Sequence, residues 1–113
     1  MRRRQTNDRD LLGGTLDLLI LRVVRAGPAH GLQIAQSIEQ KSDDVLLVEQ
    51  GSLYPALHRL EERGWIQSEW GVSDANRKAK FYSLTKAGRK HLAAEESRFT
   101  QLANAIARVL RST

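Results

Sequence analysis

The sequence predicts a mainly helical α+β fold with one small β-hairpin. Aromatic and β-branched residues are concentrated at 65–72 and 79–85, on either side of a polar turn, which predicts the hairpin. Apolar residues recur at helical spacing in four other segments, at about 8–25, 30–41, 52–63 and 86–113. Because no internal repeat or flexible linker interrupts them, we treat residues 1–113 as one unit.

The global composition limits the function classes. A chain of 113 residues can bury one modest core, and its net charge of +5 favours a polyanionic partner, either nucleic acid or an acidic membrane surface. The longest apolar run, 18–24, contains Arg22 and is too short to cross a membrane. Residues 1–5 are basic but lack the apolar region of a signal peptide, so we expect a cytoplasmic location. The absence of cysteine excludes disulfides and thiol chemistry.

The first helix is expected to be apolar on most sides, and the second to bury a smaller set of apolar residues. Asp8 or Asp10 is expected to cap the first helix, whose apolar residues surround most of its circumference, as is typical of a helix covered from two directions. The run at 45–48 fits either a short strand or an apolar connector, because periodicity does not distinguish them. The second helix is expected to bury its apolar side chains, Leu32, Ile34, Ala35 and Ile38.

The third helix is expected to have one buried and one exposed face. Its helical wheel places Leu53, Ala56, Leu57 and Leu60 on one side, and Ser52, Tyr54, His58 and Arg59 on the other. Pro55 has no amide hydrogen, so we expect it in the first turn, where Ser52 and nearby amides are free to bind phosphate. Gly64 is expected to take the left-handed conformation that ends a helix.

The returning side of the hairpin is strongly basic. Arg77, Lys78 and Lys80 follow the turn at 73–76, and no acidic residue occurs between residues 75 and 94. An unopposed positive strip beside an exposed helix is typical of nucleic-acid-binding proteins, since it attracts phosphates. We therefore expect the third helix to enter the major groove of double-stranded DNA.

The last helix carries an apolar seam. Leu92, Phe99 and Ile106 recur every seven residues, with Leu102 and Val109 between them. The seam could fold back on its own domain, but we favour pairing with a second copy, because the first helix is also apolar on two sides. The expected dimer interface comprises Leu12, Leu16, Leu19, Leu92, Phe99, Leu102, Ile106 and Val109.

Four stretches closely resemble the PadR family of bacterial transcriptional regulators: GTLDLLIL at 14–21, AHGLQIAQ at 29–36, EQGSLYPALHRLEERGWI at 49–66 and NRKAKFYSLTKAGRKHL at 76–92. The resemblance implies a winged helix-turn-helix at 8–85 and a dimerisation helix at 86–113, as in the smaller branch of the family. It also implies a homodimeric repressor that binds a pseudo-palindromic operator, and therefore a place at the bacterial nucleoid. The sequence leaves open whether an inducer releases the repressor; an unknown small molecule is one possibility.

The same resemblance assigns individual residues. The SLYPAL pattern and the following His-Arg imply that Ser52, Tyr54, His58 and Arg59 contact DNA. The RKAKFY pattern implies that Arg77, Lys78 and Lys80 belong to the wing, at about 72–80, which contacts phosphate or the minor groove. One departure is Leu32, where the family often has a tyrosine, and this weakens any role for the second helix in a ligand pocket.

Some of these residues also have a purely structural interpretation. Tyr54 would then only cover the base of its helix, and Arg59 would only pair with one of the two glutamates that follow it. For His58, at the centre of the exposed face, we favour a contact with DNA over a place in the core. Trp65 and Trp70 are expected to anchor the packing of the hairpin.

Other function classes fit less well. We expect no enzyme, because the chain lacks a Gly-rich phosphate loop, a Gly-x-Ser-x-Gly turn and a cysteine nucleophile. We expect no metal or cofactor, because His30, His58 and His91 belong to three different elements. A winged domain that binds only proteins is the main alternative, although such a wing does not need three cations in a short run. RNA is less suitable, because the deep groove of A-form RNA does not admit a helix.

Overall fold

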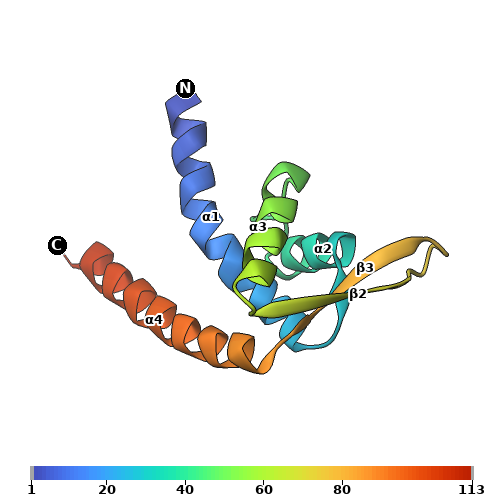
Figure 1. Ribbon diagram of the computed structural model, residues 1–113. Coiled ribbons are helices and arrows are strands. Elements are labelled where there is room, and N and C mark those ends of the chain that lie inside the picture. Colours follow the sequence, from blue (N-terminus) through green and yellow to red (C-terminus); the bar gives the residue numbers. More distant parts are fainter. Residues whose placement is uncertain (1, 113) are drawn as a thin grey trace.

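The computed structural model describes the backbone of residues 2–112 and the side chains of residues 14–112. Figure 1 shows α1, α2 and α3 packed together, with the β2–β3 hairpin projecting to one side and α4 leaving on the other. The expected α+β fold and its order of helices and hairpin are confirmed. The elements are α1 (Arg2–Arg25), β1 (Ala29–His30), α2 (Gly31–Lys41), α3 (Gln50–Glu62), β2 (Ile66–Val72), β3 (Lys78–Leu84) and α4 (Lys86–Arg111).

The core lies where α1, α2 and α3 meet the base of the hairpin and the first turns of α4. Each leucine or isoleucine buried there contributes about 1.5–3 kcal/mol through removal of apolar surface from water. The predicted inner face of α3 is confirmed, because its four apolar residues are at most 1% exposed. The largest fully buried side chains are Leu16, Ile20, Leu21, Ile34, Leu53, Leu57, Leu60, Ile66, Leu92 and Val24.

A third strand, β1, was not expected from the sequence. It pairs antiparallel with β3, in the order β1-β3-β2, with Ala29 opposite Tyr82 and His30 opposite Phe81. Two residues are too few to show an alternating pattern, so the sequence contains no signal for this strand. His30 also caps α2, since its Nδ1 accepts from the amide of Gln33 at 3.3 Å and its own amide donates to Gln33 Oε1 at 3.0 Å. The start of α2 is thereby attached to the hairpin.

The structure corrects two expectations, about the start of α1 and about Leu32 in α2, and shows the form of the run at 45–48. The α1 helix begins at Arg2, so Asp8 and Asp10 lie inside it and do not cap it. Leu32 was expected to be buried but is 55% exposed. The buried side of α2 is formed by Gly31, Ile34 and Ile38, and Leu32, two positions before Ile34, lies on the opposite side of the helix. Residues 45–48 form a connector, held by a hydrogen bond of 2.9 Å from the Val48 amide to a carboxylate oxygen of α2.

The junction between α3 and α4 is tightly built. Gly64 has φ +77°, the left-handed conformation predicted for the end of α3. Thr85 caps α4 by accepting from the Gly88 amide at 2.9 Å, and its hydroxyl donates to the Gly64 carbonyl at 2.6 Å. A Cβ at Gly88 would collide with the carbonyl oxygen of Trp65. The start of α4 is therefore fixed against the chain that leaves α3.

Candidate nucleic-acid interface

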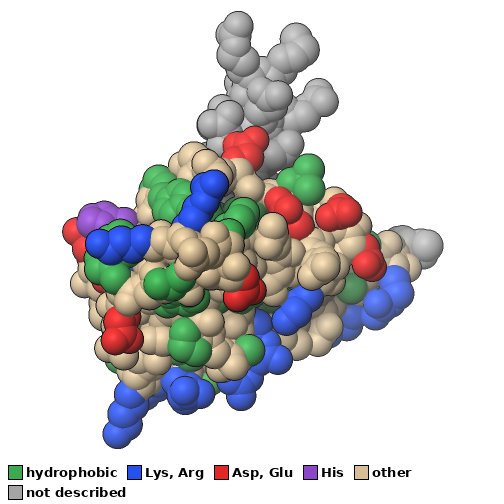
Figure 2. Space-filling model, turned by 90° about the vertical axis from the view of Figure 1, so that its right-hand side faces the viewer, with side chains coloured by type: hydrophobic (Ala, Val, Ile, Leu, Met, Phe, Trp, Pro, Cys, Tyr) green, Lys and Arg blue, Asp and Glu red, His purple; other side chains and the backbone are tan. Residues whose placement is uncertain are grey.

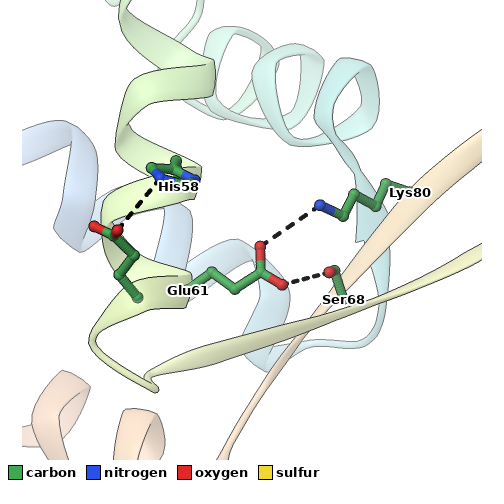
Figure 3. Close-up of polar contacts among 5 residues, drawn as sticks. His58, Glu61, Ser68 and Lys80 are labelled. Atoms are coloured by element: carbon green, nitrogen blue, oxygen red, sulfur yellow. Dashed lines mark hydrogen bonds and ion pairs between the residues drawn. The ribbon is translucent and has the colours of Figure 1, made fainter.

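The outer face of α3, formed by Gly51, Tyr54, Pro55, His58 and Glu62, is exposed in the described structure. His58 Nε2 lies 3.4 Å from a carboxylate oxygen of Glu62, one turn later, and both side chains are largely exposed (Figure 3). The helix begins at Gln50, so Pro55 lies in the second turn and not in the first turn as expected. Pro55 therefore leaves the Gly51 carbonyl, on this exposed face, without its usual helical donor.

Tyr54 packs on another helix and not on the base of its own. Its ring and hydroxyl lie against the start of α2, where a Cβ at Gly31 would come within 2.7 Å of the Tyr54 hydroxyl oxygen. The side chain nevertheless remains 48% exposed. Tyr54 thus covers the α2 terminus with one side and presents the other side to solvent.

Arg59 lies on the flank of α3 that faces α1. One of its guanidinium nitrogens lies 2.7 Å from Asp17 Oδ1, and both side chains are partly exposed. The partner proposed for a structural Arg59 was a glutamate on the same helix, and the structure gives a residue of α1 in its place. Ser52 lies on the same flank of the helical wheel and is partly buried.

The flank of α3 that faces the hairpin contacts it through Glu61. Ser68 Oγ donates to Glu61 Oε2 at 2.5 Å, and Lys80 Nζ lies 3.8 Å from Glu61 Oε1 (Figure 3). Burial, and then the charge of Glu61, raises the pKa of the nearby Tyr82 phenol. Lys80, expected to be free for phosphate, is thus paired with a carboxylate at the base of the wing.

The tip of the wing is a polar turn whose conformation is fixed by hydrogen bonds. The Ser73 amide donates to the Arg77 carbonyl at 2.8 Å, and the Asn76 amide donates to the Ser73 carbonyl at the same distance. Asn76 has φ +59°, which asparagine tolerates better than most residues. Among the described residues, neither Arg77 nor Lys78 has an acidic partner. These two cations are therefore available to a phosphate.

The basic strip seen in the sequence is divided in space. β3 begins at Lys78, at the wing tip, and its seven residues span roughly 20 Å; Lys86, at the start of α4, follows two residues after the strand ends. Figure 1 shows these two points at opposite ends of the hairpin. In Figure 2 many of the Lys and Arg side chains gather along the lower edge of the molecule. The cations of the wing tip thus lie apart from those of α4.

The apolar seam of α4 is only partly free. Leu92 and, on α1, Leu16 are each 1% exposed within this single chain, so their expected place in a dimer interface is corrected. Both are buried because the first turns of α4 already pack on α1. Leu19 is partly buried, and the side chain of Leu12 lies outside the described residues. Farther along α4 five large apolar side chains are exposed: Phe99, Leu102, Ile106, Val109 and also Leu110, which lies outside the predicted seam.

A hollow of about 730 Å³ lies between α1 and α4. On its wall, Trp65 stacks on His91 with ring centroids 3.5 Å apart, which confirms Trp65 as a packing residue. A hydrogen bond of 2.8 Å from Arg98 lowers the pKa of Glu95 at the same site. Leu18, Phe99 and Leu102 are also part of its lining, so the hollow joins the exposed seam of α4.

The comparisons with known proteins identify the family. The model of the transcriptional regulator PadR-like family matches residues 20–94, which include α2, α3, the hairpin and the start of α4. The chain belongs to this PadR-like family of transcriptional regulators. A curated relative, the transcriptional regulator Rv3488 of Mycobacterium tuberculosis, is 32% identical over 98 residues, covering 87% of this chain and 88% of its own.

Solved structures of similar proteins support the same PadR assignment. A transcriptional regulator from Clostridium thermocellum is 26% identical with a TM-score of 0.79, and the match covers 88% of this chain and 96% of that one. A PadR family transcriptional regulator from Eggerthella lenta is 28% identical with a TM-score of 0.76, covering 96% and 93%. The protein is thus a PadR-family transcriptional regulator. None of its described helices combines the length and the apolar character needed to cross a membrane.

Proposed function

We propose that this protein is a homodimeric, cytoplasmic repressor that binds a pseudo-palindromic operator. The outer face of α3 would enter the major groove, and the wing would contact phosphate or the minor groove. One observation carries the proposal: the outer face of α3 is exposed beside a hairpin whose tip presents Arg77 and Lys78 without acidic partners in the described structure. A helix and a ribbon of that kind match the shape and the charge of duplex DNA.

We assign some of these side chains to base recognition and the others to phosphate binding. Tyr54 and His58 are both exposed and are the residues we assign to base edges. Ser52 and Arg59, on the flank that faces α1, are better placed for the DNA backbone, because Arg59 already bonds a carboxylate at 2.7 Å and phosphate offers the same geometry. Arg77, Lys78 and Lys80 are assigned to phosphate, the last in exchange for its contact with Glu61.

Dimerisation would cover the apolar surface of α4. Five large apolar side chains between residues 99 and 110 are 48–79% exposed, and contiguous apolar surface of this kind is typical of a protein interface. The hollow between α1 and α4 adjoins this surface and could receive the α4 helix of a second copy. Residues 86–113 would then form the dimerisation part and residues 8–85 the DNA-binding part. Any inducer would act by changing the spacing of the two α3 helices.

Selection of bound sequences from random duplex DNA tests the proposal. We expect a palindromic consensus with half-sites about 10 base pairs apart, because a two-fold symmetric dimer reads two equivalent sites on one side of the helix. A parallel selection with His58→Ala serves as the control, and its consensus should lose information at one position in each half-site. No enriched sequence with the wild-type protein would favour the alternative, a winged domain that binds only proteins.

A further inference from the structure

The hairpin has one face that continues from α3 out to the wing tip. Side chains alternate along a strand, so the cross-strand pairs Ser68–Tyr82, Trp70–Lys80 and Val72–Lys78 share one face. Ser68 and Lys80 on this face both contact Glu61 of α3 (Figure 3). The face that packs on α3 at its base therefore carries Trp70 and Val72 farther out.

Trp70 is not the packing residue that the sequence suggested. It is 62% exposed, and Val72 beyond it is 66% exposed. Lys78 Nζ lies 5.3 Å from the centre of the Trp70 indole, within the range of a cation–π contact. On the opposite face of the hairpin the aromatic ring of Phe81 is partly buried, since it lies against Gly71 and edge-on to His30. Only the α3 side of the outer hairpin thus combines an open aromatic surface with cations.

This combination matches the chemistry of the DNA backbone, which alternates apolar deoxyribose rings with phosphates. Because Trp70 lies on the α3 side of the hairpin, we infer that it packs against deoxyribose when duplex DNA binds. Lys78 and Lys80, beside it, then contact the adjoining phosphates. The inference rests on the proposed function and assigns the wing an apolar contact besides its charges. Such a contact releases no counterions, so its contribution to affinity is independent of salt.

Tryptophan fluorescence provides the first test, because Trp65 and Trp70 are the two tryptophans of the chain. A Trp65→Phe variant leaves Trp70 as the emitter, and a Trp70→Phe variant leaves Trp65, stacked on His91, as the matched control. We expect a selected operator duplex to reduce acrylamide quenching of Trp70 several-fold and to change that of Trp65 little. If Trp65→Phe does not fold, the difference between the wild-type chain and Trp70→Phe gives the signal of Trp70.

Affinity measurements provide the second test. Trp70→Ala should weaken duplex binding about tenfold at every salt concentration, with an unchanged slope of log affinity against log salt. Lys78→Ala should reduce that slope, and Gln67→Ala, on the other face of β2, should change neither quantity.

The outcomes separate this inference from the proposed function. Failure of the wild-type protein to bind any duplex would overturn both. Operator binding with unchanged quenching of Trp70, or with full affinity in Trp70→Ala, would overturn the deoxyribose contact alone. Protection of Trp70 that depends on protein concentration without DNA would assign it to a protein interface and would also overturn the inference.

Discussion

Arg59 of α3 and Asp17 of α1 form an ion pair of 2.7 Å between residues 42 positions apart in the chain. The pair joins the helix assigned to DNA to the helix that lines the hollow beside α4, since Asp17 also lines that hollow. A carboxylate and a phosphate compete for the same guanidinium. The availability of Arg59 to DNA therefore depends on what happens to Asp17.

Asp17→Asn is expected to raise the affinity for DNA of any sequence up to about fivefold, because it removes a competitor of phosphate worth at most about 1 kcal/mol at this partly exposed position. Anisotropy of labelled duplexes measures the change. The double variant Asp17→Asn/Arg59→Ala is the control and should lose the gain. Weaker binding by Asp17→Asn would mean that the pair holds α3 in its binding orientation.

The two faces of α3 are expected to respond differently to truncation. His58→Ala should narrow the gap between operator and random-DNA affinity by about 1–3 kcal/mol and leave the free energy of unfolding nearly unchanged. Leu57→Ala, its buried neighbour, should lower the free energy of unfolding by about 2–5 kcal/mol through a cavity. Urea denaturation and gel-shift assays measure the two effects. Severe unfolding by His58→Ala would contradict the assigned faces.

The cations at the wing tip and those on α4 are expected to contribute unequally to DNA binding. Replacing Arg77 and Lys78 with Ala should weaken binding to all duplexes and reduce the log–log salt slope by up to about 0.9 per lost phosphate contact. The same change of charge at Arg89 and Lys90, on α4, is the matched control and should affect the slope less. Equal effects of the two double variants would show that the long-range charge matters and the position of the wing does not.

Gly88→Ala is expected to destabilise the fold by about 3 kcal/mol, because the added methyl group meets the rigid carbonyl of Trp65. Gly51→Ala is the matched control, since a Cβ there has no neighbour within 4 Å and alanine favours helix by about 1 kcal/mol. Thermal and urea unfolding compare the two variants. Equal stability of both would contradict the tight junction between α3 and α4.

Ile106→Lys is expected to yield monomers, because a lysine buried in an apolar interface without a partner costs several kcal/mol. Operator binding should then fall steeply, since a monomer engages one half-site. Light scattering combined with gel shifts measures both effects. Gln101→Lys adds the same charge on another side of α4 and should stay dimeric. If the wild-type protein is monomeric at micromolar concentration, operator binding by a symmetric dimer is contradicted.

The sequence by itself determined the features that depend on neighbours along the chain. The spacing of Leu53, Leu57 and Leu60 predicted the inner face of α3, and Gly64 marked its end, because helical periodicity and left-handed backbone are properties of a few consecutive residues. The basic wing was also readable, since its two strands flank a polar turn. These local signals, with the resemblance to PadR regulators, were sufficient for the fold class and for the order of the helices and the hairpin, but not for the short strand β1.

Tertiary structure decided which side chains are free. Arg59 is paired with a residue of α1 and Lys80 with one of α3, and no spacing in the sequence brings those partners together. Leu92 continues the α4 seam by periodicity yet is buried. Trp70 has a large aromatic side chain, as core residues often do, yet it is exposed. Periodicity reports which face a residue occupies, whereas burial depends on whether a distant segment packs on that face. The availability of these groups to DNA or to a second copy was therefore set by the packing of α1, α3, α4 and the hairpin.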